Sequence, residues 1–172
     1  MNSKTSDEAD IASLVGELSD RDGVVRERAR KALVTLGGDA VSPLNDLLIS
    51  SHSEQARWEA AKILGKIEDK RSIPALVKAL GDSNTDVGWV AAEGLKKFEM
   101  DAWPSLLNAL IEGDPEDSGL LYLGAHHVLV DQKEDGYDDL LATLLKDLEE
   151  GGLSESAMVA ARKMLARMKP GQ

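Results

Sequence analysis

The chain has 172 residues, 20 Lys and Arg against 31 Asp and Glu, a net charge of −11 and no cysteine. This length predicts one domain with enough chain to bury a core. The lack of Cys excludes disulfides and thiolate chemistry. The acidic balance argues against nucleic acid as a partner, because neutralisation of phosphates supplies most of that affinity.

The first ten residues, MNSKTSDEAD, lack the basic-then-apolar order of a signal peptide. Nowhere does the sequence hold an apolar run of the roughly 18 residues that would span a bilayer. We therefore expect no membrane association and a cytoplasmic location.

An internal repeat dominates the sequence. Five segments share a leucine pair four residues apart, and the steps between them are 30, 32, 30 and 34 residues. The pairs are Leu14/Leu18, Leu44/Leu48, Leu76/Leu80, Leu106/Leu110 and Leu140/Leu144. Each is followed by a second segment, at 25–36, 56–67, 87–98, 121–132 and 157–168.

The second segments have helical periodicity, with apolar residues at the first position and at +4, +7, +8 and +11. Good N-cap residues stand three positions before each of them: Asp22, Ser53, Asn84, Ser118 and Ser154. The pattern predicts an all-α, right-handed α-α superhelix, formed as a single solenoid over residues 1–172. Its five helix-turn-helix repeats are expected at about 7–37, 40–68, 71–99, 101–132 and 136–168. First helices should lie outside and second helices inside.

Residues 56–82, ARWEAAKILGKIEDKRSIPALVKALGD, resemble the short HEAT-like repeats of the phycobilisome-lyase type. The resemblance covers about residues 11–168 and implies the solenoid fold. It does not imply one function, because the family includes scaffolds, chromophore lyases, a di-iron hydroxylase and DNA-glycosylase relatives. The family arginine of the second helix matches Arg26 and Arg57. Gly88, Tyr122 and Met158 replace it in later repeats, so the resemblance implies an incomplete ladder of Asp–Arg pairs.

The chemical activities of that family are not expected here. The hydroxylases need repeated His-Glu pairs, and this chain has three His and no His-Glu dipeptide. His126 and His127 are adjacent, so on a helix they diverge and do not readily chelate one ion; a solvated pair is the simpler interpretation. Residues 131–136 resemble half a calcium loop but lack its ligands at Lys133 and Ala142. Because no standard catalytic motif occurs, we expect no enzyme activity, metal or cofactor.

The outward face of the inner helices yields the candidate site. Its apolar row reads Trp58, Trp89, Leu123 and Val159, flanked by Lys31, Lys62, Lys96, His127 and Lys163. Apolar residues on an outward face indicate a binding groove, unless curvature or a loop covers the indoles. Trp103 and Tyr122 are expected to pack in the core.

The first functional hypothesis is a monomeric, non-catalytic scaffold or adaptor that presents a concave groove to a protein partner. One alternative is an accessory or maturation factor for an enzyme or chromophore protein, and another is a structural part of a larger assembly. Residues 101–150 alone carry 2 basic and 13 acidic side chains. The acidic clusters at 112–117 and 147–150 should lie on one edge of the solenoid, and the cluster at 131–139 should lie on the opposite edge. They are expected to form either a solvated surface or a second contact surface for a basic partner.

Overall fold

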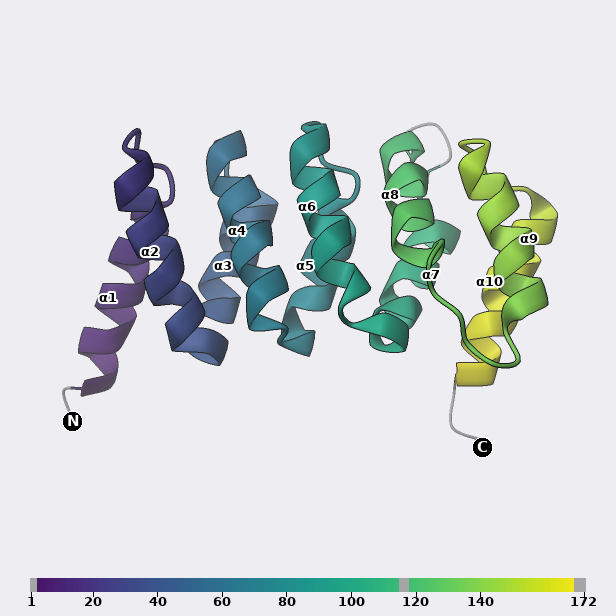
Figure 1. The fold of residues 1–172 in the computed structure, drawn as a ribbon, viewed down its shortest axis with the longest axis horizontal. Coiled ribbons are helices and arrows are strands. Elements are labelled where there is room, and N and C mark those ends of the chain that lie inside the picture. The colour runs from purple at the N-terminus through teal and green to yellow at the C-terminus, as the bar shows by residue number, and fades with distance from the viewer. Residues whose placement is uncertain (1–2, 115–117, 169–172) are drawn as a thin grey trace.

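The computed structural model describes residues 3–114 and 118–168. Within those ranges the chain is helical, without strands, and forms an α-solenoid (Figure 1). Three short 3-10 turns, at Gly37–Ala40, Lys70–Ser72 and Glu99–Ala102, each lead directly into the following helix. The α-helices are α1 (Ser3–Glu17), α2 (Gly23–Leu36), α3 (Val41–Ser50), α4 (Glu54–Ile67), α5 (Ile73–Ala79), α6 (Thr85–Lys96), α7 (Trp103–Glu112), α8 (Gly119–Leu129), α9 (Asp138–Glu149) and α10 (Glu155–Met168).

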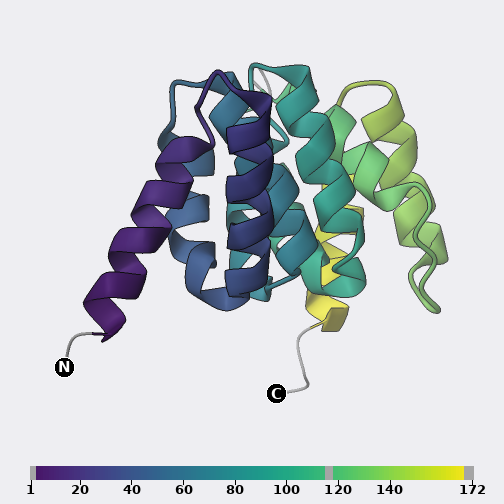
Figure 2. The same cartoon turned by 60° about the vertical axis from the view of Figure 1, so that its left-hand side comes forward.

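The helices form two rows. Helices α1, α3, α5 and α7 pack against one another in the first row, and α2, α4, α6 and α8 do so in the second row. Figure 2 brings the N-terminal hairpin forward and separates α1 and α2 into these rows. An apolar stripe on one helix cannot be buried alone, so the stacking of hairpins provides one continuous core.

Four of the five predicted N-caps accept a backbone N–H bond through their side chains. Asp22 caps α2, Ser53 caps α4, Asn84 caps α6, and Ser154 accepts from Ala157 at the start of α10. Ser118 is the exception, because its hydroxyl instead donates to the Asp114 carbonyl. The caps fix where each second helix of a hairpin begins, and therefore which of its side chains face outward.

The last hairpin is reversed relative to the others. Helix α9 packs on α8, in the second row, and α10 packs on α7, in the first row (Figure 1). The expectation that every second helix lies in the same row is therefore wrong for α10. The reason lies in the connection: α8 and α9 are joined by residues 130–137, without the 3-10 turn that leads into α3, α5 and α7. This longer link lets the chain enter the second row first.

The core is aliphatic, as the composition predicts. The leucine pairs of α3, α5 and α7 are buried, whereas α9 buries Leu141, Leu144 and Leu148 and leaves Leu140 only half-buried. Trp103 is fully buried, and its indole N–H donates to Gln132, so its expected core position is confirmed. Tyr122 is buried too.

The acidic clusters follow the edges of the solenoid. The C-terminal end of α7 and the turn after α9 lie at one edge, and the connection between α8 and α9 lies at the opposite edge (Figure 1). Part of the predicted cluster at 112–117, residues 115–117, falls outside the described residues.

Candidate functional site

Three apolar side chains lie on successive helices of the second row: Trp58 on α4, Trp89 on α6 and Leu123 on α8. We call them the tryptophan face. Trp89 is 57% exposed and Leu123 is 63% exposed. Trp58 is half-buried against the core, with the Lys62 ammonium 4.3 Å from its ring centroid. The outward orientation holds for Trp89 and Leu123, while Trp58 divides its surface between core and solvent.

A hollow of about 300 Å³ lies between α4 and α6, next to both indoles. Its floor is formed where Gly65 and Gly94 bring the two helix backbones together, since a Cβ on Gly65 would lie 2.8 Å from the Gly94 Cα. Lys62, Lys66, Lys97 and Glu93 stand around it.

A second hollow, of about 220 Å³, lies between α6 and α8, on the other side of Trp89. Leu80, Ala92, Leu120 and Leu123 supply apolar lining. The helix packing beneath it is close, because a Cβ on Gly124 would come within 3.0 Å of the Leu80 side chain. Trp89 therefore stands between two hollows and lines both.

The five predicted basic residues have different surroundings. Lys62 lines the α4–α6 hollow, as expected. Lys31 is paired with Glu27 on its own helix at 2.7 Å, and Lys96 lies 3.5 Å from both Glu93 and Asp131. Lys96 is thus directed toward carboxylates and does not line the hollow.

Two further lysines, Lys66 and Lys97, line the α4–α6 hollow and were not among the predicted residues. They occupy the same +10 position of two consecutive second segments, so an alignment of that column of the repeat would have found them. Lys97 donates to the Gly65 carbonyl at 2.7 Å and lies 3.1 Å from Glu68.

His127 lies on the tryptophan face, as predicted, and it contacts two neighbours on α6. Its ring stacks on Trp89 with centroids 3.9 Å apart, and its Nε2 lies 2.6 Å from Glu93 Oε1. The hydrogen bond from His127 lowers the pKa of the Glu93 carboxyl, against a smaller opposing effect of burial. His127 therefore holds the Trp89 indole and the Glu93 carboxylate in place. The interpretation of His127 as a simply solvated residue is wrong.

Val159 and Lys163 do not join the tryptophan face. Both lie on α10, which packs against α7 in the first row rather than against α8. Val159 is 41% exposed there and Lys163 is exposed. The reversal of the last hairpin is the reason, because it exchanges the rows of α9 and α10.

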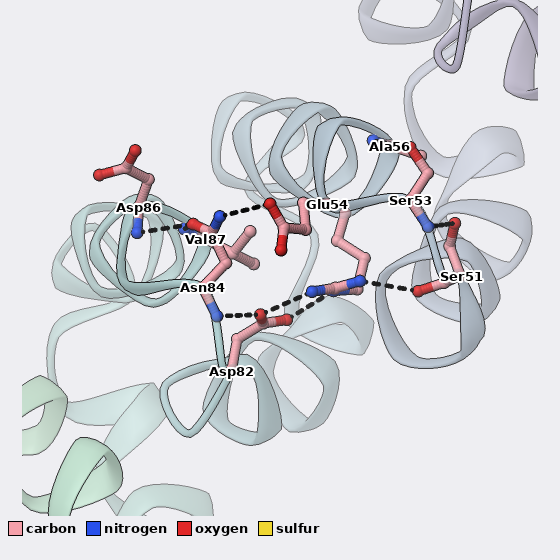
Figure 3. Close-up of polar contacts among 9 residues, drawn as sticks. Ser51, Ser53, Glu54, Ala56, Asp82, Asn84, Asp86 and Val87 are labelled. Carbon is pink, nitrogen blue, oxygen red and sulfur yellow. Dashed lines mark hydrogen bonds and ion pairs between the residues drawn. The ribbon is translucent and has the colours of Figure 1, made fainter.

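Polar contacts between repeats hold the start of α4 and of α6 in register (Figure 3). Arg57 binds both carboxylate oxygens of Asp82, at 2.7 and 2.8 Å, and donates to the Ser51 carbonyl. Asn84, the cap of α6, donates to Glu54 at 2.9 Å. These bonds tie the first turn of α4 to the residues that begin α6, close in sequence to Trp58 and Trp89.

The expected ladder of Asp–Arg pairs is incomplete. Arg57 pairs with Asp82, which lies 25 residues later. The residue 25 positions after Arg26 is Ser51, which carries no charge, and Arg26 donates instead to the carbonyls of Asp20 and Arg21. Arg26 and Arg30 both approach the buried carboxylate of Glu59, at 3.6 and 3.1 Å. The α2–α4 contact is therefore held by two arginines on one acid.

Within residues 3–114 and 118–168, no group of three His, Asp or Glu side chains is placed to hold a metal ion. In the same ranges, no helix has both the length and the apolar character needed to cross a membrane.

The family of HEAT repeats matches the sequence over residues 11–96 and 41–120. These two overlapping matches cover more than half of the 172 residues and include the helices that carry Trp58 and Trp89. The finer likeness to the phycobilisome-lyase type has no counterpart in these matches. No curated protein matches the chain. On its repeats and its two-row solenoid, the chain belongs to the HEAT-repeat family.

Proposed function

We propose that this protein is a non-catalytic scaffold or adaptor whose tryptophan face receives a protein partner. The observation that carries the proposal is the exposure of Trp89, 57%, between two hollows and beside the 63% exposed Leu123. A large aromatic side chain flanked by open hollows is typical of the anchor positions of protein interfaces. HEAT repeats are commonly protein-interaction scaffolds, which supports the same proposal.

The groups around the hollows favour binding over catalysis. Glu93 and His127 bond to each other, and Lys97 is bonded to a backbone carbonyl. The remaining lining of the α6–α8 hollow is largely apolar. Such a surface supplies contact area and charge, so we infer a binding role. We also propose that the protein acts as a monomer in the cytoplasm.

An accessory or maturation factor of the phycobilisome-lyase type would need to hold a small molecule. Small-molecule sites have volumes of roughly 300 to 1,000 Å³ and enclose most of their ligand. The hollows of about 300 and 220 Å³ lie at or below the lower end of that range. Their size favours single side chains of a protein partner, so we place this alternative second.

The test is an affinity capture from the organism of origin with Trp89→Ala and Leu123→Ala combined in one variant. The matched control combines Ile49→Ala and Val159→Ala, which remove exposed apolar side chains from the first-row helices α3 and α10. We expect both variants to keep the helical circular dichroism of the parent, and only the first to lose its partners. Equal retention by both variants would refute the proposed surface.

A further inference from the structure

Building on the proposed function, we infer that the tryptophan face binds an extended, acidic peptide segment with apolar side chains at every third residue. The segment runs across α4, α6 and α8. Its carboxylates lie over the α4–α6 hollow and an apolar side chain enters the α6–α8 hollow.

The spacing of the helices argues for an extended segment. Packed helices lie 8–10 Å apart, and the glycine contact between α4 and α6 places this pair at the near end of that range. A polyproline-like chain advances about 3.1 Å per residue and returns to the same side every three residues, roughly 9 Å. Side chains three residues apart in such a peptide therefore have the same spacing as Trp58, Trp89 and Leu123. A helical partner would need side chains about seven residues apart to cover the same distance.

The local charge argues for an acidic segment. Three ammonium groups, of Lys62, Lys66 and Lys97, and one carboxylate, of Glu93, surround the α4–α6 hollow. Glu93 is already engaged by His127. Lys97 is paired with Glu68 at 3.1 Å, so the cationic charge left for a partner comes from Lys62 and Lys66. Within the described residues, Lys66 is exposed and forms no ion pair. The hollow is thus a cationic patch on a chain of net charge −11, and it is complementary to carboxylates of a partner.

The two hollows differ, which gives the bound segment a direction. Three lysines line the hollow beside Trp58, whereas no lysine lines the hollow beside Leu123, where three leucines and Ala92 lie next to His126 and His127. Asp82, at the margin of the second hollow, is neutralised by Arg57. Acidic residues should therefore lie toward α4 and the deepest apolar side chain between α6 and α8.

A selection experiment tests the inference. A phage library of random peptides, long enough to cross three helices, is selected on the full chain after depletion on the Trp89→Ala variant. We expect the selected peptides to contain Asp or Glu in excess and apolar residues spaced by three. Enrichment of Lys and Arg, apolar residues spaced by about seven as for a helix, or no enrichment at all would overturn the inference.

Fluorescence anisotropy with a selected peptide then locates the site. We expect Trp89→Ala and Leu123→Ala each to weaken binding by at least about tenfold, as for interface anchors. Lys62→Glu with Lys66→Glu should weaken it by about three- to tenfold, whereas Lys163→Glu on α10 should leave it unchanged. An equal effect of the two kinds of charge reversal would overturn the acidic specificity. If affinity capture of partners still depends on Trp89 but the peptide selection fails, only the inference of an acidic extended peptide is wrong. If affinity capture does not depend on Trp89, the proposed scaffold function is wrong as well.

Discussion

Gly65 and Gly94 bring the backbones of α4 and α6 into direct contact. A Cβ on Gly65 would lie 2.8 Å from the Gly94 Cα, and one on Gly94 would lie 3.2 Å from the Gly65 Cα. Only residues without side chains allow helices to approach in this way. The contact forms the floor of the hollow between Trp58 and Trp89, so the spacing of the two indoles depends on it.

We predict that Gly65→Ala destabilises the protein. Alanine favours the helix by about 1 kcal/mol over glycine, but overpacking against a backbone costs about 1–3 kcal/mol, so the net change should be a loss. Gly94→Ala should lose less, because its contact is 0.4 Å longer, 3.2 against 2.8 Å. The measurement is the free energy of unfolding in urea.

Gly16→Ala in α1 is the matched control, since nothing lies within 4 Å of a Cβ at that position. It should leave stability unchanged or raise it. If Gly65→Ala behaves like Gly16→Ala, the backbone contact does not limit the approach of α4 to α6.

The Arg57–Asp82 pair should give the protein a defined sensitivity to acid. Burial alone would raise the pKa of Asp82, but hydrogen bonds from the Arg57 side chain and the Asn84 N–H outweigh it and lower the pKa. Because the pKa is lower in the folded state, the stabilisation is present above the unfolded value of about 3.9 and is lost as pH falls through the folded pKa. Asp82→Asn should cost about 1–2 kcal/mol at neutral pH, because both side chains are largely buried.

The variant should also lose part of the pH dependence of unfolding below about pH 4, measured by urea titration at several pH values. Glu17→Gln is the control: its partner Arg28 is 68% exposed, so screening by water should leave little change at neutral pH. A pH profile of Asp82→Asn that coincides with the parent would contradict the assigned role of the pair.

Much of this fold was predictable because repetition multiplies weak signals. One Asp or Ser before an apolar run is a poor indicator of a helix start, but five at one aligned position specify it, and four of them act as caps. Ser118 does not cap α8 through its side chain, because its hydroxyl donates to the Asp114 carbonyl. The outward placement of Trp89 and Leu123 followed from the same periodicity.

The reversed hairpin and the true basic lining were not predictable in this way. Helical periodicity tells which side of a helix is buried, but not which neighbouring helix buries it. Helix α10 buries Ala157, Ala160, Ala161 and Met164, and the spacing of these residues does not specify which row they face. A lysine side chain is also long enough to leave its helical position, so Lys96 reaches Asp131 while Lys97 turns to the Gly65 carbonyl.

Glu59 should be the most costly carboxylate to neutralise in the α2–α4 contact. Its side chain is 3% exposed and balances two arginines, Arg26 and Arg30. Glu59→Gln leaves both guanidinium groups without a counter-charge, so we expect a loss of about 2–4 kcal/mol in the free energy of unfolding. Glu27→Gln, which removes an exposed carboxylate from α2, is the control and should change little. A loss for Glu59→Gln as small as that expected for Glu27→Gln would contradict the stabilising role of the buried network.

The reversal of the last hairpin can be measured directly because the chain has no cysteine, so spin labels attach only where a cysteine is introduced. Asn108 on α7, Leu123 on α8 and Lys163 on α10 are exposed sites for this purpose. Since α10 packs on α7, the label pair Asn108→Cys with Lys163→Cys should give a shorter distance by pulsed electron double resonance than Leu123→Cys with Lys163→Cys. A regular fifth repeat would place α10 beside α8 and reverse that order. The reverse order would also return Val159 and Lys163 to the tryptophan face, so this one comparison decides how far that face extends.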